Sequence, residues 1–278
     1  MMKKIGYAVT LTWDIVKLNL GIVLNSRKFV GVLIFLFAIN TLPGFVSYIM
    51  ASKFKYYSAL SKILDFTATW EVLLLSNVFA VILPLFLTSI ALNDQIRVKR
   101  IFNTVVRPIK REIIFASMMA AILIISLIIG LSLGAYFYLS LTLGALIGGK
   151  LISIPPMIVL QLTLLITLSA LFYSNFMALI SLYTRDYGLK SIIVFFFLTM
   201  LFDLLFTALG GNYLLVTLNY YKISILYNLA GDPILMEKLA KQIPIPPASI
   251  PTTFLTLTLI AAIVFFLALK LFINHDIN

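Results

Sequence analysis

Long runs without charge dominate this sequence and restrict what the chain can fold into. Between residues 113 and 184 the only charged side chain is Lys150. Of all 278 residues, 62% are hydrophobic and 11% are charged, whereas soluble domains average about 45–50% and about 25%. A water-soluble domain of this size has too little interior to bury so much apolar surface. The sequence therefore predicts an all-α integral membrane protein.

Six stretches are long enough for a transmembrane helix, which needs about 20 largely apolar residues. Glycines and prolines between residues 144 and 156 are expected to form a turn that divides the long uncharged region into two crossings. We therefore expect one transmembrane domain over residues 1–278, with spans at about 29–50, 72–92, 113–138, 157–183, 191–210 and 251–273. An even number of spans places both termini on the same side.

The 21 lysines and arginines predict the orientation of these spans. With the N-terminus in the cytoplasm, 14 of them lie on the cytoplasmic side and 7 outside, which agrees with the positive-inside rule. In a soluble protein a net charge of +11 would suggest a nucleic-acid partner. Here we expect the excess of basic residues to orient the spans and to contact anionic membrane lipid. We expect a multi-pass protein of the cell membrane with both termini cytoplasmic and no nucleic-acid partner.

The segment before the first span has its own helical pattern. Leu11, Ile15, Leu18 and Ile22 recur at three- and four-residue spacing. This pattern predicts a helix within residues 1–28 that lies in the membrane interface. The alternative is a cytoplasmic extension of the first span.

The loop at residues 93–112 combines a basic surface with an apolar pattern. Six basic and two acidic residues place it in water or headgroups, and Pro108 ends a short helix that precedes the third span. The apolar residues that recur at helical spacing are Val98, Ile101, Phe102, Val105, Val106 and Ile109. One interpretation is a helix that docks on a partner, on lipid or on its own bundle; the other is a basic loop that only sets the topology.

This loop resembles the cytoplasmic coupling segment of type-2 ABC-transporter (ABC-2) permeases. An acidic start at Asp94, an apolar patch, Arg107–Pro108 and the run Lys110 to Glu112 match that segment, while Phe102–Asn103–Thr104 stands where the family usually has Gly-Thr. Three further stretches resemble the family in order and spacing: Val23 to Phe35 before the first span, Leu171 to Phe197 around the fourth and fifth spans, and the ending LALKLFINHDIN.

The resemblance implies a permease subunit of an ABC exporter, a six-span fold with an N-terminal elbow helix and a short coupling helix. It implies a second permease, identical or related, as partner. A separate ATP-binding subunit would hold ATP and magnesium, so that this chain has no cofactor and is not an enzyme. We expect Phe102 and Val105 to be apolar contacts to the ATPase and the arginines to dock. The coupling residues would be Asp94, Arg97, Arg100, Phe102, Val105 and Arg107.

Residues 211–250 are too long for a simple turn. They contain an amphipathic pattern from residue 233 to 241 and prolines at 244, 246 and 247. In the family that this chain resembles, the corresponding connection forms short re-entrant helices near the exit of the pathway. An ordinary interfacial aromatic loop is the alternative.

Asp203 is the one acidic residue inside a predicted span. An ionised carboxylate in the hydrocarbon is unfavourable, so this residue should face a cavity, find a partner or stay protonated. It could be a polar point on the translocation pathway or a hydrogen-bonded packing residue between helices.

Signals for catalysis are weak throughout the sequence. The stretch from Gly144 to Leu151 nearly fits a phosphate-binding loop, but leucine replaces the required hydroxyl residue. His275 is the only histidine, there is no cysteine, and the acidic residues are scattered, so no metal site is predicted. We interpret the GxxxG pairs at 130/134 and 144/148 as helix packing. An ion-gradient-driven secondary transporter and a non-transporting membrane assembly subunit remain the alternatives to an exporter.

Overall fold

The computed structural model describes residues 2–70, 80–97, 110–152, 157–209, 218–229, 233–241 and 245–274. These residues form helices joined by short turns, and no strand occurs among them. The prediction of an all-α protein is therefore confirmed for the described part of the chain. In chain order the helices are α1 (Met2–Leu24), α2 (Arg27–Ile39), α3 (Leu42–Lys53), α4 (Tyr56–Trp70), α5 (Ala80–Thr88), α6 (Asp94–Arg97), α8 (Arg111–Ile147), α9 (Met157–Thr184), α10 (Leu189–Leu209), α11 (Leu218–Leu229), α12 (Pro233–Ala240) and α13 (Ile250–Asn274).

Four helical stretches of the described chain are long and apolar enough to cross a membrane. They are Arg27–Lys53, formed by α2 and α3 together, then α8, the segment Leu189–Phe206 of α10, and α13. The apolar stretch Val81–Ile96 is shorter, and residues 71–79, where the second predicted span begins, lie outside the described part. These helices are compatible with an integral membrane protein, while the number of six spans stays a prediction.

The first predicted span is not one continuous helix. It breaks at Asn40 and Thr41, because Pro43 opens α3 and cannot continue the hydrogen bonding of α2. The polar side chains at the break bind the end of α2. Asn40 Nδ2 donates to the Leu36 carbonyl at 2.8 Å, and Thr41 Oγ1 donates to the Ala38 carbonyl at 2.6 Å.

The third predicted span ends later than expected. We expected it at residues 113–138, followed by a turn around Gly144 and Gly148, but α8 continues to Ile147 and Gly148 caps it. At 1.5 Å per residue, α8 is about 55 Å long, well beyond the roughly 30 Å hydrocarbon core. Gly144 lies inside the helix, where α3 crosses α8 very closely. A Cβ atom at Gly144 would collide with the carbonyl of Gly44, so the crossing requires glycine.

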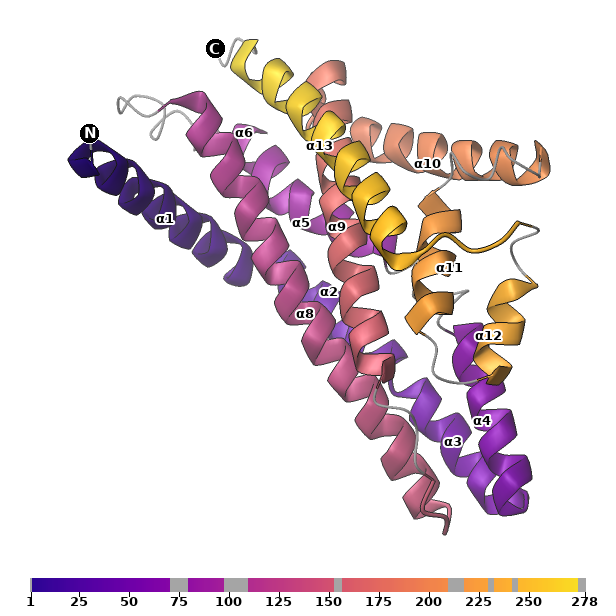
Figure 1. The fold of residues 1–278 in the computed structure, drawn as a ribbon. Helices are drawn as coiled ribbons and strands as arrows, with labels where there is room; N and C mark the ends of the chain where they lie inside the picture. Colours follow the sequence, from indigo (N-terminus) through magenta and orange to yellow (C-terminus); the bar gives the residue numbers. More distant parts are fainter. Residues whose placement is uncertain are drawn as a thin grey trace.

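Helix α8 is the central element of the fold (Figure 1). Helices α1, α3 and α9 pack along it, and α13 packs on α9 and on the start of α8. The largest buried cluster gathers around α8, and smaller ones lie around α11 and between α5, α9 and α10. The start of α1 and the end of α13 lie at the same end of the bundle, whereas α4 and α12 lie at the other end (Figure 1).

Helix α10, the fifth predicted span, has a different position. It leaves the bundle and runs across the direction of α8 and α13 (Figure 1). Its one fully buried large side chain among the described residues is Phe195, whose ring centroid lies 6.1 Å from that of Tyr173 and 5.9 Å from that of Phe176. A single aromatic cluster thus attaches α10 to α9.

Candidate functional site

The segment predicted to couple to a partner begins in direct contact with the N-terminal region. Asp94 opens α6, and its Oδ2 lies 2.7 Å from Nζ of Lys28 in the first turn of α2. The two side chains are 25% and 52% exposed, so this ion pair adds at most about 1 kcal/mol to stability. Its structural effect is to join the start of α2 to the start of the predicted coupling segment.

A π-helical turn, Ser89–Asn93, connects α5 to α6. Such turns insert one extra residue into a helix and occur frequently at functional sites. Asn93 is completely buried, and neither its Oδ1 nor its Nδ2 has a hydrogen-bond partner among the described residues. Asn19 on α1 is also buried and leaves its Nδ2 unpaired there. The junction of α1, α2 and α6 therefore has a polar interior.

A pocket of about 610 Å³ opens at this junction. The charged groups on its wall are Lys17 of α1 and Asp94 of α6. The complete lining is Lys17, Leu18, Gly21, Ile22, Asn25, Ser26, Ile90, Asp94 and Gln95. Helix α1 with the turn after it, the π-helical turn and α6 thus line a partly polar recess.

Helix α1 buries only part of the predicted apolar stripe. Ile15 is buried, together with Val16 and Val23, whereas Leu18 is 55% exposed. The prediction of a helix is confirmed over Met2–Leu24. Its interfacial position stays a prediction.

Most of the predicted coupling residues cannot be placed. Arg97 is the last residue of α6, and Arg100, Phe102, Val105 and Arg107 lie outside the described residues. The start of the predicted short helix is helical and follows α5 directly through the π-helical turn, while residues 98–109 lie outside the described part. Asp203 lies in α10, and its side chain is likewise outside the described part.

A polar turn between Thr184 and Leu189 separates the helices of the fourth and fifth predicted spans. Asp186 stabilises the start of α10, because its Oδ1 accepts hydrogen bonds from the amides of Gly188 at 2.9 Å and Ser191 at 3.4 Å. Burial raises the pKa of Tyr187 to about 12, and the charge of Arg185 opposes part of this rise. The phenol therefore stays protonated at physiological pH.

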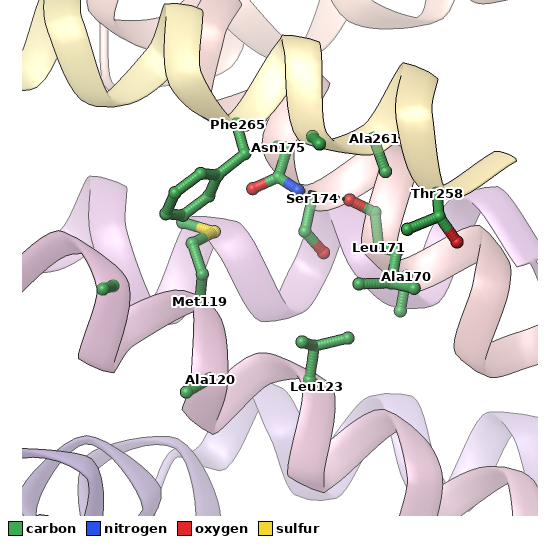
Figure 2. Close-up of a pocket in the computed structure, with 12 residues that line it drawn as sticks. Met119, Ala120, Leu123, Ala170, Leu171, Ser174, Asn175, Thr258, Ala261 and Phe265 are labelled. Carbon is green, nitrogen blue, oxygen red and sulfur yellow. Dashed lines mark hydrogen bonds between the residues drawn. The ribbon is translucent and has the colours of Figure 1, made fainter. Parts of the chain in front are cut away.

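A second pocket, of about 270 Å³, lies between α8, α9 and α13 (Figure 2). Figure 2 shows Ser174 and Asn175 of α9 pointing into the space that faces the other two helices. Both residues are buried, at 2% and 6% exposure, and the rest of the wall is almost entirely apolar. The larger side chains of the wall are Met119, Leu123, Leu171 and Phe265.

The residues of this second pocket are not among those predicted from the sequence. Ser174 and Asn175 lie in an uncharged predicted span, and their polarity within that run was the available signal. Lys222 was expected in an outer loop, but it lies in α11 and is 3% exposed, with its Nζ 5.7 Å from the ring centroid of Tyr173. Helix α4 was also missed, although Ala59, Ile63 and Leu64 recur at helical spacing.

The stretch that nearly fits a phosphate-binding loop has a packing role. Gly144 and Gly148 face α3, and the ammonium group of Lys150 donates to the carbonyl oxygen of Ala51. Gly149 takes the left-handed conformation, with φ of 83°, which ends α8. The interpretation of the glycine pair as helix packing is confirmed for 144/148, and Gly134 of the other pair contacts Val159 of α9.

No family model matches the chain, and no curated protein matches it significantly.

Proposed function

We propose that this chain is the membrane-spanning permease subunit of an ATP-driven exporter of the ABC-2 type. In this proposal it acts with a second permease, identical or related, and with separate subunits that bind ATP and magnesium. The described helices that could cross a membrane support a role in the membrane. ATP hydrolysis takes place on the partner, and this chain forms the pathway.

The contact between Lys28 and Asp94 carries the proposal. An exporter of this kind must transmit the movement of a cytoplasmic ATPase to its membrane helices. A push on residues 94–107 would reach α2 through the ion pair and α5 through the π-helical turn, because Asp94 adjoins both. The buried, unpaired amide of Asn93 supports the same proposal, since it makes the turn less stable than a regular helix.

The arrangement of the termini is also in agreement. The start of α1, helix α6 and the end of α13 lie at the end of the bundle where Arg111 donates a hydrogen bond to the Ile273 carbonyl at 2.7 Å (Figure 1). Both predicted cytoplasmic termini would then lie on the ATPase side. Asp203 is proposed as a polar point of the pathway, and unchanged transport and folding in Asp203→Asn would remove it from that role.

The decisive experiment measures coupling in the assembled complex. The full chain is purified in mild detergent from its native membranes, and the hydrolysis of magnesium-ATP by the co-purified complex is compared with that of the isolated ATPase. In the double variant Phe102→Asp and Val105→Asp, we expect the stimulation by this chain to fall at least tenfold, because two apolar contacts become charged.

The control is Tyr57→Asp, which introduces one aspartate at a side chain that is 84% exposed on α4. It should leave the stimulation unchanged. Equal stimulation in the double variant and the wild type would overturn the coupling role. If no ATP-hydrolysing subunit accompanies the chain, the exporter assignment is wrong, and a secondary transporter or an assembly subunit takes its place.

A further inference from the structure

The second pocket contains two polar atoms that no described residue satisfies. Asn175 Nδ2 donates to the carbonyl of Leu171, which leaves its Oδ1 without a partner, and Ser174 Oγ is also unpaired. Some other serines bind the preceding helical turn, as Ser117 does with the Ile113 carbonyl at 2.6 Å. Leaving a buried polar atom unpaired costs about 1–3 kcal/mol. Both atoms are buried in residues of the pocket wall, so a ligand whose polar group reaches them would supply the missing hydrogen bonds.

The chemistry of the wall limits the ligand. None of the twelve described residues that line the pocket is charged, and five of them are alanines. A charged group would be desolvated there without a counter-ion, which is strongly unfavourable. Asn175 Oδ1 is an acceptor only, so the ligand must donate a hydrogen bond. An uncharged molecule with an apolar body and a hydroxyl group meets these conditions.

The shape of the pocket indicates how such a ligand enters. Helices α8 and α13 are held together at one end by Arg111 and by the ring of Phe115, whose centroid lies 5.5 Å from that of Phe265 and 5.3 Å from that of Phe272. Away from this end Thr258 is exposed on the pocket's rim. The opening thus lies between two apolar helices, on the surface that lipid chains cover in a membrane protein.

We propose that this pocket binds a neutral, single-chain lipid alcohol. Its hydroxyl donates to Asn175 Oδ1 and shares a second hydrogen bond with Ser174 Oγ, while its chain lies against Met119, Leu123 and Phe265. The five alanines leave space beside the larger side chains, and the volume of about 270 Å³ suits one unbranched chain. This inference does not depend on the exporter assignment, because it requires neither ATP nor a partner.

The test uses the purified full chain in lipid nanodiscs and a decan-1-ol that carries a terminal diazirine as photoaffinity probe. We expect saturable labelling of peptides from α8, α9 and α13. Unlabelled decan-1-ol should compete about tenfold better than its methyl ether, which can accept a hydrogen bond but cannot donate one. Decane and decanoate should compete still less, since the first lacks the polar group and the second is charged.

Two variants test whether Asn175 and Ser174 bind the probe. Asn175→Leu keeps the size of the side chain and removes the acceptor, so the affinity for the probe should fall about tenfold, and Ser174→Ala should lower it about threefold. The matched control is Ser181→Ala, because Ser181 is also buried on α9 with an unpaired hydroxyl but does not line the pocket. It should bind the probe like the wild type.

The competition series on the wild-type chain does not depend on how the variants fold. Non-saturable labelling, or equal competition by decan-1-ol, its ether and decane, would overturn the proposal. Either result would mean that water or a second protein chain satisfies Ser174 and Asn175. The measurement is made without ATP, so a failed coupling experiment leaves it unaffected.

Discussion

Helices α8 and α10 are both apolar enough to cross a membrane, yet they have opposite surroundings. In the most apolar stretch of α8, 61% of the residues are buried, against 18% in α10. Helix α8 contains glycines, alanines and serines along its length, whereas α10 is built mainly from phenylalanine and leucine. Small residues allow helix backbones to approach closely. The difference teaches that side-chain size, more than hydrophobicity, decides which apolar helix becomes the centre of such a bundle.

The largest effect should come from filling the closest helix crossing. We expect Gly144→Ala to destabilise the protein by about 3 kcal/mol or more, because the new methyl group would collide with the backbone carbonyl of Gly44, which cannot move freely. The measurement is the unfolding free energy in mixed detergent–SDS micelles. The matched control is Gly31→Ala in α2, where the added Cβ would have no atom of a packing neighbour within 4 Å. This variant should be neutral or stabilising by about 0.5–1 kcal/mol. If the two variants were equally stable, the close crossing of α3 and α8 would not explain why α8 is the central helix.

The effect of truncating one leucine in each helix compares α8 and α10 directly. Leu133 in α8 is 1% exposed and Leu204 in α10 is 68% exposed. Leu133→Ala should cost about 2–5 kcal/mol, because it leaves a cavity in the bundle. Leu204→Ala should change the stability by less than about 0.5 kcal/mol. The same unfolding assay measures both, and a large loss in Leu204→Ala would show that a partner or a further part of the chain covers α10.

The smallest effect concerns buried hydroxyl groups. Ser126 in α8 is fully buried and its Oγ is unpaired among the described residues, so Ser126→Ala should be neutral or stabilising by up to about 1 kcal/mol. In α10, Thr199 Oγ1 donates to the Phe195 carbonyl at 2.8 Å within its own helix. Thr199→Val should stay within about 0.5 kcal/mol of the wild type. Thermal unfolding in detergent measures both variants. A clear loss of stability in Ser126→Ala would indicate that the Ser126 hydroxyl binds a group inside the bundle.

Much of the helical framework could be predicted from the sequence. The long uncharged run led to two helices, and α9 begins and ends within one residue of the predicted span. Helices α12 and α13 also occupy the predicted segments, because apolar length and proline positions are local properties. The polar turn at Asp186 could be predicted for the same reason.

The candidate sites were less accessible to such reasoning. The Lys28–Asp94 contact joins residues 66 positions apart, and no periodicity indicates which basic residue an acid will meet. The pocket at Ser174 and Asn175 requires three helices that are distant in sequence. Gly144 was expected in a turn because glycine often breaks helices, but close contact with α3 overrode that tendency.

The sequence alone determined that this protein is helical and that several of its helices are apolar enough for a membrane, because both properties depend on the local order of side chains. The tertiary structure decided that α8 is central, that α10 is attached through one aromatic cluster, and that polar atoms meet at the α1–α2–α6 junction and at the pocket on α9. These outcomes depend on which helix surfaces are complementary in shape. Helices of similar hydrophobicity differ in this complementarity, and only their packing in three dimensions reveals it.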